Sequence, residues 1–295
     1  MNNWIKLLTA LLVVVLCFSL GCESSLTTKS QKRPLKALIV NGQNNHNWKA
    51  SSPILKEILE QTGIFKVDLS TSPPKNSSEV EMEKFRPNFA AYDVVVLDYN
   101  GQSWSEQTKK DFVNYVRSGG GVVVYHAADN AFPHWPEYNQ IIGLGGWGGR
   151  NEKDGPYIRW RNGRIVPDMT PGSGGSHGQK HEFEIINRNP EHPVTRDLPA
   201  TWISCNDELY SELRGPAKNL TVLATAYADP DKGGTGEHEP VLFTIRYGSG
   251  RVFHTVLGHC KGVPAASIEC PSFVVTFQRG AEWAANGQVT QKTGL

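Results

Sequence analysis

Short apolar runs separated by helix-like segments are the feature that most constrains how this chain folds. Three runs, at residues 36–40, 93–97 and 122–125, consist almost entirely of valine, isoleucine or leucine, which is typical of strands buried on both faces. A further strand is expected at residues 65–69. Parallel strands need crossover helices between them, so this alternation predicts an α/β fold with a mainly parallel sheet covered by helices.

The intervening segments carry helix start and stop signals. Ser52-Pro53 is expected to cap and begin the first helix, because serine accepts a hydrogen bond from free amides and proline loses none at the first helical position. Gly63 ends that helix. Ser103-Trp104-Ser105-Glu106 is expected to form a capping box for the next helix, which stops at the glycines 119–121.

The chain changes character in a glycine- and aromatic-rich insertion at residues 129–178. A structureless segment of this length in a compact domain is usually functional or disordered, and its aromatic residues argue against disorder. We expect an ordered lid over the strand ends, with Trp147 as a candidate sugar-binding side chain. The alternative is that the aromatic residues only form a small second core.

The last third of the chain returns to strands. A glycine-rich turn at 248–250 predicts a hairpin between the last two of them, and apolar residues at helical spacing from Phe273 to Ala284 predict a closing helix. The strands themselves are expected at residues 181–186, 209–210, 222–226, 241–247 and 251–257.

Polar side chains gather at or near the ends of the expected strands. In an open parallel sheet the carboxyl ends of the strands share one edge, where ligand crevices form. This placement therefore predicts one polar site. Its candidate residues are Asn41, His46, Asp98, Asn100, His126, His181, Asp207, Glu208 and His259.

The first residues have the features of an export signal. Lys6 and an apolar core precede Gly21-Cys22, as in a bacterial signal peptide cleaved before a lipidated cysteine. Ser19 stands where leucine is usual in such a motif, and the alternatives are an ordinary cleaved signal or an anchor helix. We expect an exported bacterial lipoprotein in the cell envelope, anchored on the periplasm-facing membrane. Its parts are a signal peptide (1–21), a lipidated tether (22–34), a folded domain (35–286) and a tail (287–295).

Charge and cysteine content exclude further classes of protein. The chain has 30 Lys and Arg against 29 Asp and Glu, and loss of Lys6 with the signal peptide brings the formal charge to zero. Nucleic-acid binding is not expected, because the sequence contains no basic cluster. Cys260 and Cys270 are close enough to pair in an oxidising compartment, which would leave Cys205 as a buried thiol, although no disulfide is the favoured expectation.

Several motifs together resemble the ThuA-like (trehalose utilisation) family, from about Leu35 to Trp283. No single motif is specific, but their order and spacing are. In chain order they are Leu-Ile-Val-Asn-Gly followed by His46 and Trp48, Gly-Gly-Gly-Val-Val-Val-Tyr-His126, His181 with Phe183, His192-Pro193, Asp207-Glu208-Leu209-Tyr210, and Gly250-Arg-Val-Phe with Leu257-Gly258-His259.

The resemblance implies a class I glutamine amidotransferase-like, flavodoxin-like three-layer sandwich. It also implies a role in disaccharide or 3-keto-sugar metabolism, with a sugar oxidoreductase as a partner in the same pathway. Fold relatives use a cysteine nucleophile at the turn after a central strand, activated by a histidine. Here that turn is Tyr125-His126-Ala127-Ala128, so glutamine amidotransferase chemistry is excluded.

Four candidates are expected to carry the chemistry. His126 or His259 is the candidate base, Glu208 the orienting group or acid, and His46 lies beside them. For each histidine the alternative is a buried imidazole satisfied by hydrogen bonds. The candidate substrate-binding residues are Asn41, Asp98, Asn100, His181, Asp207 and Trp147. Structural or surface roles are expected for His134, His177, His192, His238 and His254.

A divalent metal is an open alternative to metal-free acid–base chemistry. Three imidazoles and a carboxylate suit Zn²⁺, or Mn²⁺ or Fe²⁺ with waters. The ligands would be His46, His126, Glu208 and His259, although no tight spacing such as HExxH supports a metal from the sequence alone.

We therefore expect an exported enzyme that cleaves a disaccharide or 3-keto-sugar by hydrolysis or elimination. A keto group acidifies the neighbouring C–H bond, so a histidine base is sufficient to start elimination. The alternative, from another class, is a non-catalytic lipoprotein that binds glycans or partner enzymes in the same crevice.

The Cys22→Ser substitution tests the anchor. It should release the protein from membranes, because one amino-terminal lipid is the only anchor that the sequence predicts. Membrane fractionation and mass after fatty-acid labelling measure the effect. Unchanged fractionation together with unchanged mass would contradict lipidation at this cysteine.

Overall fold

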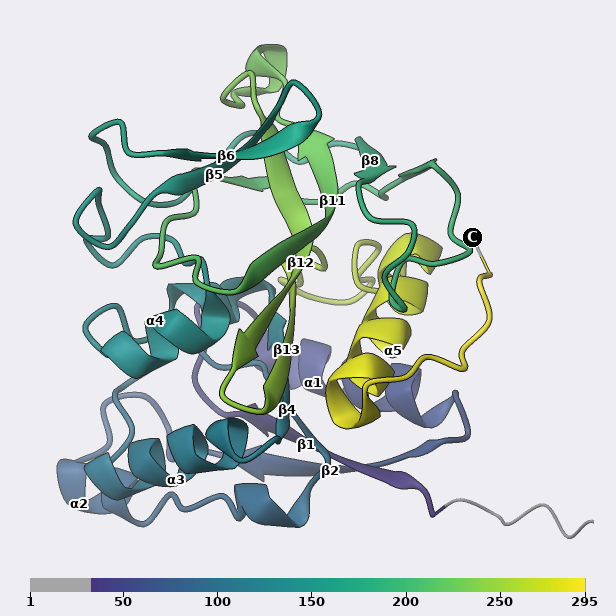
Figure 1. Cartoon of the computed structure of the whole chain (residues 1–295). Coiled ribbons are helices and arrows are strands. Elements are labelled where there is room, and N and C mark those ends of the chain that lie inside the picture. Colours follow the sequence, from purple (N-terminus) through teal and green to yellow (C-terminus); the bar gives the residue numbers. More distant parts are fainter. Residues whose placement is uncertain (1–32, 295) are drawn as a thin grey trace, which may run out of the picture. The chain divides into compact units, whose positions relative to one another are not determined.

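A mixed β-sheet runs through the centre of the protein (Figure 1). The computed structural model describes residues 33–294, so the predicted signal peptide, Cys22 and nearly all of the tether lie outside the described residues. Within residues 33–294, nine strands form the sheet in the order β2-β1-β3-β4-β13-β12-β11-β8-β9.

The first five strands of this order are parallel and carry the predicted apolar runs. Every residue of β3 and β4 is buried, as expected for strands covered on both faces. The bounds are β1 (Leu35–Asn41), β2 (Phe65–Thr71), β3 (Val94–Leu97), β4 (Gly121–Tyr125) and β13 (Gly250–Thr255).

The sheet continues beyond β13 as antiparallel strands, and the hairpin predicted at residues 248–250 joins β12 to β13. These strands are β12 (His238–Tyr247), β11 (Leu220–Tyr227), β8 (Glu184–Asn187) and β9 (Thr201–Ile203). The strand expected from His181 begins at Glu184 instead, and His181 pairs with Asp207 in an isolated bridge.

Helices cover both faces of the sheet, which confirms the predicted three-layer α/β sandwich (Figure 1). One layer holds α1 (Trp48–Glu60) and α5 (Pro271–Asn286), and the other holds α3 (Glu106–Arg117) and α4 (Pro136–Ile142). The remaining helical segments are α2 (Glu79–Glu83), η1 (Phe89–Ala91), η2 (His126–Asn130) and η3 (Pro230–Lys232).

Helix α1 begins earlier than predicted, at Trp48, so Pro53 lies inside it. The hydroxyl groups of Ser51 and Ser52 donate hydrogen bonds of 2.6 and 2.7 Å to the buried carboxylate of Asp98. Ser52 was expected to cap and start the helix because a serine side chain can accept hydrogen bonds from free amides. In the structure Ser52, like Ser51, makes a tertiary contact instead.

The expected capping box of the next helix is also wrong. Ser105 is the N-cap of α3, and its hydroxyl accepts the backbone N–H of Thr108. Glu106 is therefore the first helical residue rather than the third, and Ser103 lies outside the helix.

The 129–178 insertion is ordered and divides into two environments. Trp135 and Tyr138 join the core, where both rings pack on Phe132. Trp147 instead packs on Tyr210, with 4.7 Å between ring centroids. The insertion also contributes the hairpin β5 (Tyr157–Arg161) and β6 (Arg164–Asp168), and β7 (Ser176–His177), which pairs with β10 (Tyr210–Ser211).

The expectation that no disulfide forms is wrong, and the observed bond also differs from the pairing that the sequence allowed. Cys205 bonds to Cys270, and Cys260 is the buried free cysteine. Proximity in sequence favoured the 260–270 pair, whereas the fold brings Cys205, just before β10, to the N-terminus of α5. Among the described residues, no helix is both long enough and apolar enough to cross a membrane.

Candidate functional site

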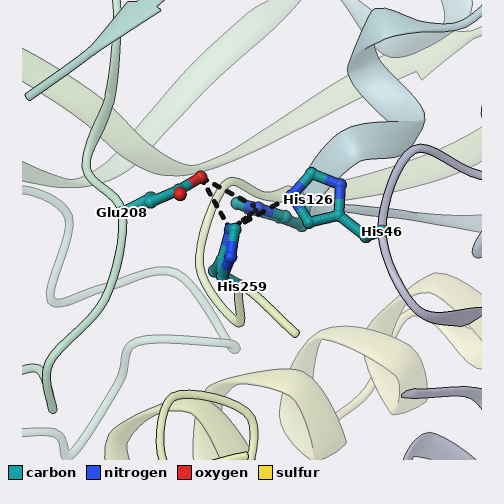
Figure 2. Close-up of side chains that lie close together, drawn as sticks. All are labelled: His46, His126, Glu208 and His259. Atoms are coloured by element: carbon teal, nitrogen blue, oxygen red, sulfur yellow. Dashed lines mark hydrogen bonds and ion pairs between the residues drawn. The ribbon is translucent and has the colours of Figure 1, made fainter. Parts of the chain in front are cut away.

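Four side chains from distant parts of the chain converge in one cluster (Figure 2). His46 lies in the loop before α1, His126 directly after β4, Glu208 just before β10 and His259 after β13. One nitrogen or oxygen atom from each of these residues lies within 4.8 Å of the others. We call His46, His126, Glu208 and His259 the four-residue cluster.

The Nδ1 atom of His259 is the common contact of the cluster. It lies 3.1 Å from Nε2 of His46, 3.3 Å from Nε2 of His126 and 2.7 Å from Oε2 of Glu208. A ring nitrogen carries either one proton or one lone pair, so it cannot satisfy three partners at once. Donors bound to one ion at ~2.1 Å lie roughly 3.0–3.4 Å apart, which is close to this spacing.

His126 is held in a strained conformation at the end of β4. Its φ angle is +43°, which is uncommon for a residue other than glycine. Its Nδ1 lies 2.6 Å from the carbonyl oxygen of Val256. Because a carbonyl oxygen only accepts, Nδ1 carries the proton and the lone pair of Nε2 faces the cluster, which is how metal-bound histidines are commonly oriented.

Asp207 positions two members of the cluster. Its carboxylate accepts hydrogen bonds from the backbone N–H groups of Glu208 (2.8 Å), Gly258 (2.7 Å) and His259 (3.0 Å). The neighbouring Glu208 side chain points into the cluster, and Asp207 therefore acts as a positioning residue.

Asp98 positions His46 rather than lining the site, which corrects its expected role in binding substrate hydroxyls. Asp98 is fully buried, and besides the two serines it accepts a 3.0 Å bond from Nδ2 of Asn44. The Oδ1 atom of Asn44 accepts the backbone N–H of His46 at 3.0 Å. The carboxylate of Asp98 is thereby occupied by protein groups and fixes the His46 loop.

His46, His126 and Glu208 have the protonation state that metal ligands require. Burial, and then His259, lower the pKa of His46 to about 4, and burial followed by His46 holds the pKa of His126 well below its usual range. Burial raises the pKa of Glu208, but the hydrogen bond to His259 and the nearby histidines outweigh it and lower that pKa. At neutral pH these groups are two neutral imidazoles and a carboxylate.

The other candidates lie around the cluster or serve the backbone. Asn41 is buried, and Asn100 donates a 2.8 Å bond to Asn45. His181 pairs through its backbone with Asp207, and its Nδ1 lies 2.8 Å from the carbonyl oxygen of Gln179. Their expected contacts with a substrate remain predictions, as do the roles of the cluster residues.

His177 belongs to the site, although it was expected on the lid surface. Its Nε2 lies 3.9 Å from Oε2 of Glu208, and its side chain is 40% exposed. Its Nδ1 lies 2.9 Å from the carbonyl oxygen of Gly178, so Nδ1 carries a proton. The pairing of β7 with β10 places His177 opposite Tyr210, and no sequence signal announced that pairing.

His254 has the structural role expected for it. It is fully buried, with its Nδ1 2.9 Å from the carbonyl oxygen of Ile142 and its Nε2 3.5 Å from the carboxylate of Asp129. A cavity of about 790 Å³ lies at the opposite, amino-terminal edge of β3 and β4, beside Asp93 and Gly120, away from the cluster residues.

The trehalose utilisation (ThuA) family matches residues 36–284. The chain belongs to the ThuA family. The family expectation from the sequence is confirmed, and so is the class I glutamine amidotransferase-like fold.

Solved structures agree with this assignment. A ThuA-like protein from Parabacteroides merdae is 50% identical with a TM-score of 0.85, and the match covers 88% of this chain and 93% of that one. A ThuA-like protein from Bacteroides uniformis is 19% identical, with a TM-score of 0.55 and coverage of 88% and 94%.

A cytoplasmic protein from Salmonella typhimurium is 12% identical, with a TM-score of 0.51 and coverage of 85% and 99%. At such low identity, the Bacteroides uniformis and Salmonella structures show the fold alone. No curated protein matches the chain.

The buried carboxyl of Asp98 should make stability depend on pH. Burial raises its pKa to about 7 against the opposing hydrogen bonds of Ser51, Ser52 and Asn44. The carboxyl of Asp98 therefore takes up a proton on folding between about pH 4 and pH 7, and its contribution to the free energy of unfolding falls as the pH rises through this window. Chemical denaturation at about pH 5 and pH 8 measures this change. The decrease in the free energy of unfolding between the two pH values should be smaller for Asp98→Asn than for the wild type.

The exposed Asp111→Asn variant is the matched control and should follow the wild type. Equal pH dependence in wild type and Asp98→Asn would show that the carboxyl of Asp98 does not take up the proton.

Proposed function

We propose that this ThuA family protein is an exported, divalent-metal-dependent enzyme that cleaves a disaccharide or 3-keto-sugar. The observation that carries the proposal is the four-residue cluster, in which three imidazole nitrogens and one carboxylate oxygen face the same point. A Zn²⁺, Mn²⁺ or Fe²⁺ ion held by these atoms satisfies all four donors together.

The geometry favours a metal over acid–base chemistry by the cluster alone. The proton on Nδ1 of His126 leaves the lone pair of Nε2 facing His259, and at neutral pH His46 is also uncharged. Without a cation, a proton on Nδ1 of His259 forms a hydrogen bond to Glu208. The Nε2 atoms of His46 and His126, which also face Nδ1 of His259, are then left without a donor. The tight cluster also favours an enzyme over a non-catalytic glycan-binding lipoprotein, for which dispersed histidines are expected.

The ion, when bound, supplies Lewis-acid polarisation of a sugar carbonyl oxygen. His177 is the proposed base, because its Nε2 lies 3.9 Å from Oε2 of Glu208, at the edge of the cluster, and its side chain is 40% exposed and so accessible to a ligand. It takes the proton from the carbon beside the keto group. The C–H electrons then form a C=C bond, the glycosidic C–O bond on the next carbon breaks, and the leaving sugar oxygen takes a proton from water.

The sugar substrate is supported by the family and by the aromatic wall of the site. Trp147 packs edge to face on the buried Tyr210 next to His177, and the partly exposed indole ring of Trp147 suits the apolar side of a sugar ring. A sugar oxidoreductase in the same pathway is the proposed source of the keto group.

Export is supported by the signal-like sequence at residues 1–21 and by the disulfide bond between Cys205 and Cys270. Disulfide bonds persist in oxidising compartments and are rare in the cytosol. Lipidation at Cys22 is part of the same proposal.

Loss of one cluster side chain should abolish tight metal binding. After dialysis against zinc, manganese or ferrous iron, the wild type should retain about one ion per chain, because four donors face one point. Glu208→Gln and His126→Ala should each weaken binding by at least about tenfold. Elemental analysis measures the retained metal, and addition of a chelator should lower the melting temperature of the wild type only.

The exposed His134→Ala variant is the control for loss of a histidine and should keep its metal. Equal metal content in the cluster variants and this control would refute the metal site.

Substitution of His177 should slow turnover without removing the metal. His177→Ala is expected to lower kcat for a 3-keto-disaccharide by about 10²–10⁴-fold, the usual contribution of a positioned base, while His134→Ala keeps wild-type turnover. Metal content is measured on the same samples. Unchanged kcat would exclude His177 as the base, and lost metal would make it a ligand or a structural residue.

A further inference from the structure

A hollow of about 420 Å³ opens beside the four-residue cluster, and His259 forms part of its wall. The loop from Lys261 to Ser267 forms one side, and Lys180 and Asn206 contribute to the rest. Two lysine residues thus line a space shared with a cluster residue. No Asp or Glu is among the residues that line it.

The backbone fixes both lysines close to the cluster. Lys261 follows His259 by two residues, and its carbonyl oxygen accepts a 3.4 Å bond from the side chain of Asn47, the neighbour of His46. Lys180 precedes His181, whose backbone exchanges bonds of 3.2 and 3.1 Å with Asp207. The two lysines are therefore adjacent to the segments that carry His46, Glu208 and His259.

Neither lysine is neutralised within residues 33–294, since the ion pairs of that part of the chain involve other cations. An anion in the hollow would therefore meet unpaired positive charge from two sides.

On the basis of the proposed function, we propose that this hollow is an anion subsite and that the sugar substrate carries a carboxylate or phosphate group. The anion would take charge-assisted hydrogen bonds from Lys180 and Lys261, with the amide of Asn206 as a further donor. The sugar ring would then extend past His259 toward the cluster. A divalent ion in the cluster adds positive charge next to the same space, which strengthens the selection for an acidic sugar.

Calorimetric titration of the purified full-length protein tests the subsite. The probes are glucuronate, glucose 6-phosphate and glucose, titrated at low ionic strength into zinc-loaded and chelator-stripped protein. We expect at least one acidic sugar to bind about tenfold or more tightly than glucose. This difference in affinity corresponds to one strong charged contact that glucose cannot make. The probe that binds more tightly identifies carboxylate or phosphate as the recognised group.

The double variant Lys180→Gln/Lys261→Gln should remove this preference while glucose binding stays unchanged. The matched control is Lys66→Gln/Lys218→Gln, which removes the same charge from two exposed positions outside the hollow and should keep the preference. Elemental analysis of both variants should show wild-type zinc content, because neither lysine belongs to the cluster.

Two results would overturn the subsite. Either neither acidic sugar binds more tightly than glucose to the wild type, or the two double variants bind the acidic sugars equally well. The stripped protein separates this outcome from failure of the metal centre. A lysine-dependent preference for acidic sugars over glucose that persists without zinc supports the subsite, even where the protein binds no metal. Metal binding without this preference refutes the subsite and leaves the metal site standing.

Discussion

The buried carboxylate of Asp207 is the contact on which the geometry of the site depends. It joins the backbone of Glu208 to that of Gly258 and His259, so one acceptor fixes two donor side chains carried by different segments. Burial raises the pKa of this carboxyl, and the three amide bonds oppose that shift. The adjacent residues Asp207 and Glu208 thus have different roles. Asp207 holds the backbone in place, and Glu208 directs its carboxylate into the cluster.

The parallel part of the sheet supplies the other half of the arrangement. Strand β4 lies between β3 and β13, so the residue that follows it emerges at the middle of the sheet edge. The left-handed backbone of His126 aims the side chain across that edge toward His259. The resemblance to the glutamine amidotransferase-like fold implies a cysteine nucleophile after the corresponding strand, and here the same position presents an imidazole. A strained turn can therefore be kept while the chemistry that it presents changes.

Features set by local pattern could be predicted from the sequence, and features set by tertiary contacts could not. Buried apolar runs gave β1, β3 and β4, and the carboxyl ends of the strands pointed to the residues that the structure brings together. The start of α1 was misplaced because Ser51 and Ser52 bind Asp98 instead of capping the helix. The position of His177 beside the cluster was missed because it depends on the pairing of two-residue strands. The disulfide bond of Cys205 was missed because its partner is 65 residues away in the sequence.

The disulfide bond also divides the donors of the cluster by topology. Glu208 and His259 both lie within the covalent loop that Cys205 and Cys270 close, whereas His46 and His126 lie outside it, in the segments that follow the N-terminal strands β1 and β4. Each part of the chain on its own offers two donors, and the full set exists only after the two parts have docked. An ion that requires all four donors can therefore bind only after both parts have folded and docked. A chain in which one part alone has folded cannot bind such an ion.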